Sequence, residues 1–296
     1  MMKTKFTKAI GLTACSVLIV SCSNETENQF PSENLESTTV HAKLAEYEST
    51  GSALPGENDI TDMKAFLFKN GEMANIYELS APASNTYNIQ VDSRSGNLYV
   101  IAYTGGSIPT EGLLEKGLNE EAWKSSIIDM TDRQGHYYTG MTNLENANTP
   151  GNTANISLKR GLARFDLAVN SIEEISIKDV TLRNLAHSAY VFPQDGILSP
   201  SHANRKDTTI VFPQPITDSQ KGILYTYEQE NEGIEVCVTA SIGGVEKELT
   251  KSLDGPLKRN TIYTIIVRQN YIDIKLDVTF EDWEEGGNTE LTPYSE

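Results

Sequence analysis

The stretch Tyr271-Ile-Asp-Ile-Lys-Leu-Asp-Val-Thr-Phe-Glu-Asp-Trp283 decides the fold of this chain. From Ile272 to Phe280 every second residue is large and apolar, and polar or charged residues stand between them. This period of two is typical of a β-strand with one buried face and one solvent-exposed face. The alternation does not say whose groove buries that face. It could belong to the chain's own β-sandwich or to that of another molecule. The apolar residues are Ile272, Ile274, Leu276, Val278 and Phe280.

The first residues read as a lipoprotein leader. Three lysines precede a short apolar run, and Ser21 then stands immediately before Cys22. A run this short, with these flanks, predicts a secretory signal over residues 1–21 rather than a spanning helix. Its end resembles a lipobox, which implies cleavage and lipidation at Cys22. Residues 22–36 are polar and acidic, and their low hydrophobicity predicts a flexible tether.

Composition limits the classes of partner. The chain has 24 basic and 41 acidic residues and a formal net charge of −17. Such an acidic surface repels phosphate backbones, so no nucleic-acid partner is predicted. Cys15 leaves with the leader and Cys22 carries lipid, so only Cys237 remains and no disulfide is expected within the mature chain.

The remainder reads as short strands divided by turns. Alternation begins at residue 39, and residues 63–69 and 72–79 flank Asn70-Gly71, which predicts a hairpin with a primed turn. Residues 97–103 read as a central strand. Leucines, Ala122 and Trp123 recur at helical spacing over 111–130, so one helix is expected there, with Trp123 anchoring it to the sheet.

We place a domain boundary where the composition turns polar, near Pro150-Gly151. Residues 155–169 are predicted to open the second domain as one long or bent strand, with Gly161 allowing the bend. Further short strands follow, including a hairpin around Gly243-Gly244. The pattern predicts an all-β protein of two β-sandwich domains, over 37–154 and 155–296, with one short helix in the first.

The sequence carries no enzyme signature. Its four histidines are scattered, and it has neither a paired-histidine metal motif nor a nucleophile elbow nor a phosphate-binding loop. Adjacent acidic pairs such as Glu284-Glu285 are read as solvated faces on so acidic a chain. No catalytic residue, metal site or cofactor is therefore predicted.

Five stretches in order resemble the fimbrillin family, the FimA-type subunits of type V pili. They are the leader ending at Cys22, the strands at 60–71 and 97–105, Arg160-Gly-Leu-Ala-Arg-Phe-Asp-Leu167, Gly222-Ile-Leu-Tyr-Thr-Tyr-Glu228, and Lys258-Arg-Asn-Thr-Ile-Tyr263 with the terminal strand. The resemblance covers nearly all of the mature chain. It implies two transthyretin-like sandwiches, an outer-membrane lipid anchor, and self-association with other fimbrial subunits at the cell surface. Host or bacterial surface ligands are further expected partners.

In that family a trypsin-like protease removes the first strand, and the vacated groove accepts a C-terminal donor strand from the next subunit. The resemblance thus implies that Val40, Ala42 and Leu44 belong to the removable strand, over 38–45. It implies that the apolar residues of 272–280 form the donor strand. The competing interpretation leaves 271–283 in its own sandwich and exchanges only 284–296.

One departure from the family affects processing. Residues 47–60 contain no Lys or Arg, and Lys43, the nearest basic residue, lies inside the predicted first strand. Either the protease cuts after Lys43, or a protease of another specificity removes the strand, or the strand is retained. A retained strand would suit a lipid-held anchor or a terminal subunit. A surface lipoprotein that binds glycan or protein without polymerising is the alternative from another class, with Tyr137, Tyr138, Tyr225 and Tyr227 as sugar-contacting candidates.

Overall fold

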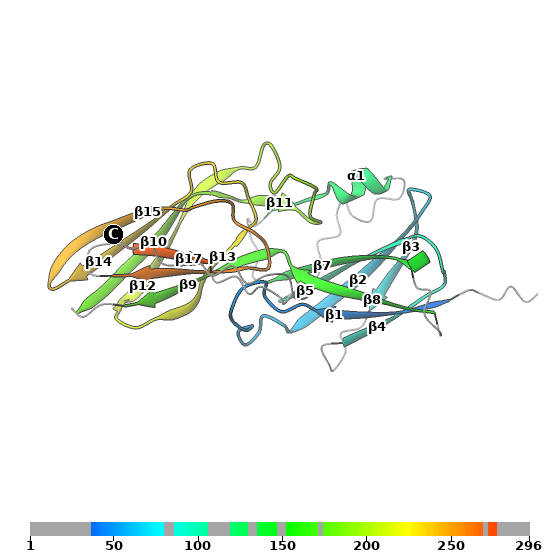
Figure 1. Cartoon of the computed structure of the whole chain (residues 1–296), viewed down its shortest axis with the longest axis horizontal. Helices are drawn as coiled ribbons and strands as arrows, with labels where there is room; N and C mark the ends of the chain where they lie inside the picture. The colour runs from blue at the N-terminus through cyan, green and yellow to red at the C-terminus, as the bar shows by residue number, and fades with distance from the viewer. Residues whose placement is uncertain are drawn as a thin grey trace, which may run out of the picture. The chain divides into compact units, whose positions relative to one another are not determined.

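The computed structural model describes residues 37–79, 86–105, 119–129, 135–146, 152–170, 174–268 and 272–276. These residues belong to one compact unit made almost wholly of strands (Figure 1). They form two sandwiches with separate apolar cores. The predicted all-β sandwich fold is confirmed.

The first sandwich is built around a continuous strand order, β3-β2-β5-β7-β8-β1-β4. β7 and β8 pair over only two residue pairs, so the sheet turns a corner there and its two halves pack face to face around a core. The turn of the β2–β3 hairpin has positive φ at Asn70 (53°) and Gly71 (78°), which confirms the predicted primed turn. The strands are β1 (Thr38–Leu44), β2 (Ile60–Lys69), β3 (Glu72–Leu79), β4 (Thr86–Val91), β5 (Asn97–Thr104), β7 (Tyr137–Asn143) and β8 (Thr153–Arg160).

The second sandwich packs two four-stranded sheets, β12-β10-β14-β15 and β13-β9-β16-β17, face to face. Their inward residues, such as Phe165, Val238 and Ile265, are fully buried. The strands are β9 (Leu162–Val169), β10 (Ile175–Ala186), β12 (Arg205–Ile216), β13 (Gln220–Tyr227), β14 (Glu235–Ile242), β15 (Val245–Ser252), β16 (Ile262–Val267) and β17 (Ile272–Leu276).

A third apolar cluster joins the two sandwiches. Trp123, which is fully buried, packs against Phe66 and Phe68 of the first sandwich and against Phe192, which follows β11. The predicted anchoring role of Trp123 is confirmed. The elements here are α1 (Glu120–Lys124), β6 (Ile127–Asp129), β11 (Ser188–Tyr190) and the 3₁₀ turn η1 (Leu144–Asn146); β6 pairs with β11.

Two predicted elements differ from the structure. Within the described residues, the expected helix over 111–130 covers only Glu120–Lys124, because Ile127–Asp129 is taken up as a strand by β11. The strand expected over 155–169, long or bent at Gly161, is two strands that meet at Gly161. β8 pairs with β1 and β7 in the first sandwich, and β9 pairs with β13 and β16 in the second. The chain passes between them at Gly161, where an added Cβ would lie 1.8 Å from the Tyr137 ring.

Candidate functional site

β1 is an interior strand of the first sandwich. It pairs antiparallel with β4 on one side and parallel with β8 on the other. Its alternate residues Val40, Ala42 and Leu44 are 0%, 0% and 5% exposed and face the core. Because β4 is bonded to no other described strand, taking β1 away would open a slot between β4 and β8.

Lys43 lies within β1, with an exposed side chain and with its backbone opposite Thr86 on one side and Ser157 on the other. β1 leads directly into residues 45–59, called here the strap, which contain no Lys or Arg. The only basic residue near the end of β1 is therefore held inside a sheet.

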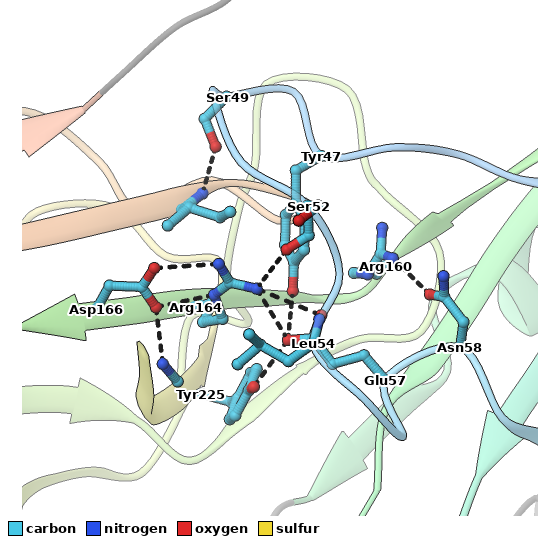
Figure 2. A network of polar contacts seen from close by, with 12 residues as sticks. Tyr47, Ser49, Ser52, Leu54, Glu57, Asn58, Arg160, Arg164, Asp166 and Tyr225 are labelled. Atoms are coloured by element: carbon cyan, nitrogen blue, oxygen red, sulfur yellow. Dashed lines mark hydrogen bonds and ion pairs between the residues drawn. The ribbon is translucent and has the colours of Figure 1, made fainter. Parts of the chain in front are cut away.

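The first half of the strap is bonded to the junction between the sandwiches. The backbone N–H of Ala45 donates to Leu158 O and that of Glu48 donates to Asn260 O, both at 2.8 Å. Asn260 Nδ2 donates to Glu46 O at 2.7 Å, and Ser49 Oγ accepts from the Ile262 N–H at 2.7 Å. Figure 2 shows the Ser49 contact and the path of the strap.

The second half of the strap buries a carboxylate, that of Glu57. Its Oε1 accepts hydrogen bonds from the hydroxyls of Tyr47 (3.0 Å) and Tyr225 (2.7 Å), and Oε2 accepts from the Leu54 N–H (2.7 Å). Nη1 of Arg164 lies 3.2 Å from Oε1 and also donates to Ser52 O at 3.0 Å (Figure 2). The strap thus contributes a buried carboxylate, which pairs with the guanidinium of Arg164 inside the protein.

The balance of charge in this network keeps Glu57 ionised. Burial by itself would raise the pKa of the Glu57 carboxyl. The hydrogen bonds from Tyr225 and Leu54 and the charge of Arg164 outweigh burial, so the pKa is lowered from its ordinary value. Arg164 is in turn held by Asp166 through a two-pronged contact of 2.9 and 3.0 Å.

A second buried arginine, Arg160, fixes the two ends of the strap. Its Nη1 donates to Ala45 O at 2.7 Å and its Nη2 donates to Asn58 Oδ1 at 2.6 Å. The guanidinium also lies 4.2 Å from the centre of the Tyr47 ring. Nη1 further donates to Asn260 at 3.2 Å, so one side chain joins the strap to both sandwiches.

Arg160 and Arg164 lie in one of the stretches that resemble the fimbrillin family, and the sequence alone predicts no role for either. Both are 1% exposed, although arginine is rarely so buried unless it is paired. Two arginines and Asp166 within an otherwise apolar run, Arg160-Gly-Leu-Ala-Arg-Phe-Asp-Leu167, indicate a buried ionic network. The sequence could not show that its carboxylate partner would be Glu57, more than a hundred residues earlier.

The predicted donor strand lies partly within the described residues. β17 pairs antiparallel with β16, and Ile272 is buried in the core of the second sandwich. The backbones of Ile274 and Leu276 lie opposite Ile265 and Tyr263. Cys22, Val278 and Phe280 lie outside the described residues, and the donor role stays a prediction.

The four tyrosines predicted as sugar-contacting candidates instead pack within the protein or bond to Glu57. Tyr137, Tyr138 and Tyr227 are 3%, 0% and 1% exposed, so their rings offer no platform to a sugar. Tyr225 donates to Glu57 and packs edge-on against His136. The hydrogen-bond capacity of the Glu57 and Arg164 side chains is largely taken up within the protein, and their arrangement suits holding a loop in place.

Comparison with known proteins gave matches among solved structures alone. No protein-family model matches the chain, and no curated protein sequence does. Within the described residues, no helix combines the length and apolar character needed to cross a membrane.

Three solved structures illustrate the likeness. A candidate cell adhesion protein from Parabacteroides distasonis is 15% identical with a TM-score of 0.58, over 84% of this chain and 92% of that one. The tip fimbrial protein Mfa3 from Porphyromonas gingivalis, truncated at its C-terminus, is 14% identical with a TM-score of 0.54, over 81% and 98%. A fimbrial assembly protein from P. distasonis is 15% identical with a TM-score of 0.51, over 82% and 98%. The chain therefore has the fold of these fimbrial and adhesion-type proteins, in line with the fimbrillin-type resemblance of its sequence.

Proposed function

We propose that the protein is a structural subunit of a cell-surface fimbria, which polymerises by strand exchange and supports adhesion. One observation carries the proposal. β1 is an interior strand with three buried apolar side chains, and no other described strand bridges β4 and β8. A slot of that kind is filled by any extended segment with matching alternation, through main-chain hydrogen bonds and side-chain pockets.

The donor segment in this proposal is 272–280 of the neighbouring subunit. Burial of its five apolar side chains would contribute roughly 1.5–3 kcal/mol each before ordering costs. In the monomer the first part of this segment pairs with β16, so it would have to leave that place on donation. In the competing arrangement β17 stays with β16 and residues 284–296 are donated.

Membrane attachment in this proposal precedes assembly. Cys22 carries lipid and holds the precursor at the outer membrane, with residues 22–36 as a tether to β1. Removal of β1 would then release the subunit from its lipid and open the slot in a single event.

A second placement within the fimbria is favoured by a specific observation. Lys43 is paired on both flanks within β1, and the strap offers no basic residue to a trypsin-like protease. A subunit that keeps β1 keeps its lipid and has no vacant slot. It would act as a lipid-held anchor or terminal subunit, and its C-terminal strand could still be donated.

Mass spectrometry of the protein in isolated fimbriae decides between the two placements. A stalk subunit is expected to begin after β1, whereas an anchor or terminal subunit is expected to begin at acylated Cys22. Finding the protein only as a monomer, with no multimers that resist SDS, would contradict both placements.

Paired substitutions test the donor strand. Val278→Asp and Phe280→Asp place a carboxylate on the face that should enter the slot, so we expect the SDS-resistant ladder to be lost. Thr279→Asp makes the same change on the opposite face of the strand and serves as the matched control. If all three variants still form the SDS-resistant ladder, donation by this segment is contradicted and donation by 284–296 is favoured.

A further inference from the structure

A cavity of about 620 Å³ lies on the outer face of the first sandwich. Its floor includes Thr139, Ser157 and Lys159, from β7 and β8 where the sheet turns its corner. Its walls come from the end of α1 and from the loop 192–197 after β11. The volume is in the range of small-ligand sites. Neither β1 nor β17 lines it, although β8, which forms one edge of the proposed slot, contributes to its floor.

The walls of this cavity are held in place by the protein itself. Gln194 Nε2 donates to Lys124 O at 2.9 Å and to Phe192 O at 3.0 Å, which ties the loop to the end of α1. Phe192 packs against Trp123, with ring centroids 4.9 Å apart. A preformed site loses little conformational entropy when a ligand binds.

The lining of this cavity carries three cations and two carboxylates, on a chain that is acidic as a whole. Lys124, Lys159 and Arg259 line it, against Glu121 and Asp195. The carboxylate partners of Lys159 and Arg259, which are Glu48 and Glu228, are not part of the lining. The positive ends of these two pairs therefore face the cavity while their negative ends do not.

The two lysines are available to a ligand. Lys159 pairs with Glu48 at 2.6 Å and Lys124 with Glu121 at 2.9 Å, and all four side chains are at least 30% exposed. Exposed ion pairs of this kind stabilise a protein by only about 0–1 kcal/mol, so a ligand carboxylate can exchange into them at small cost. Arg259 is different, since it is buried and fixed by Glu228 and by the carbonyls of residues 190 and 191.

The rest of the lining favours a compact polyhydroxylated ligand. The Thr139 and Ser157 hydroxyls and the Gln194 amide oxygen supply polar groups. The amide nitrogen of Gln194 already donates to two backbone carbonyls. Met141 and Ile197 are 53% and 49% exposed, although large apolar side chains are usually buried, and they offer an aliphatic surface to the C–H face of a ring. A pyranose ring that bears a carboxylate combines an anion, several hydroxyls and an apolar face.

We infer that this cavity binds an acidic saccharide, with its carboxylate between Lys124 and Lys159 and its ring against Met141 and Ile197. The inference goes beyond the structural role proposed above, because it gives the subunit a ligand of its own. It does not depend on strand exchange.

Isothermal titration of the purified full-length protein tests the inference. The probes are trigalacturonate and sialyllactose, with neutral lactose for comparison. We expect at least one acidic probe to bind and lactose not to bind. Lys124→Gln and Lys159→Gln should each weaken binding about tenfold or more, the cost of losing a charged hydrogen-bond partner.

Lys178→Gln is the matched control, since it removes the same charge from an exposed ion pair on β10 in the second sandwich. Its affinity should equal that of the unaltered protein. Failure of both acidic probes to bind would overturn the inference, as would equal binding of lactose. Equal weakening by all three substitutions would also overturn it, because it would show attraction to the surface as a whole. None of these results bears on polymerisation, which the ladder of SDS-resistant multimers measures separately.

Discussion

Nη1 of Arg164 lies 3.2 Å from Oε1 of Glu57, although the two residues are 107 positions apart in the chain. Their side chains are 1% and 2% exposed, so this is a buried ion pair between the strap and β9. The strap follows β1 directly, so a buried ion pair fastens the loop after the candidate removable strand to the second sandwich.

Removing the cation should destabilise the protein strongly. Arg164→Met leaves Glu57 and Asp166 buried without their partner, and we expect a loss of about 3–5 kcal/mol in the free energy of unfolding, measured with urea. Lys178→Met breaks an exposed pair with Glu246 and should change stability by less than about 1 kcal/mol. Similar losses in both variants would show that the buried pair has no special role.

Stability should fall in acid partly because of Glu57. Its folded pKa is lowered, so the unfolded state binds the proton more readily and the contribution of Glu57 is complete only above the unfolded pKa of about 4.3. That contribution is lost as the pH falls through the lower, folded pKa. We expect Glu57→Gln to flatten the dependence of the urea midpoint on pH as the pH falls below about 5. Parallel curves for the two proteins would contradict this assignment.

Gly161 should tolerate no side chain at the passage between β8 and β9. An added Cβ would lie 1.8 Å from Cζ of Tyr137, whose ring is buried, so Gly161→Ala should cost about 1–3 kcal/mol or more. In a Tyr137→Leu background the additional cost of Gly161→Ala should be clearly smaller. A double-mutant cycle measured by thermal or urea unfolding checks this, and strict additivity would contradict the contact.

The native protein should resist trypsin after Lys43, because its backbone is held between β4 and β8. Thr50 is exposed in the strap, so Thr50→Arg should create a cut after position 50 that intact-mass analysis detects. Thr50→Gln is the uncharged control and should not be cut at position 50. Rapid cleavage of the unaltered protein after Lys43 would show that β1 opens readily and would remove the argument for its retention.

The sequence alone was sufficient where the controlling interactions are local. The Asn70-Gly71 turn needs positive φ at both positions, and those two residue types adopt it readily. Trp123 stood out as an apolar anchor, and the run from Val40 to Leu44 alternated as an inward-facing strand must. Turn chemistry and side-chain alternation are properties of neighbouring residues, so they can be read without knowing the fold.

Tertiary structure alone decided which partner each segment has. Ile127–Asp129 is a strand because β11 lies beside it, and the helical spacing around it could not report that. The sequence does not predict the strand Tyr137–Asn143, because its interior glycine and polar residues weaken the alternation. The burial of Arg164 depends on a carboxylate that arrives from the strap. In the same way, β17 shows a strand pattern in sequence, but only the pairing with β16 shows where it lies in the monomer. Strand pairing and charge burial depend on residues that are far apart in the chain. A buried apolar face or a buried charge requires a partner of a certain kind, but it does not determine which segment of the chain supplies that partner.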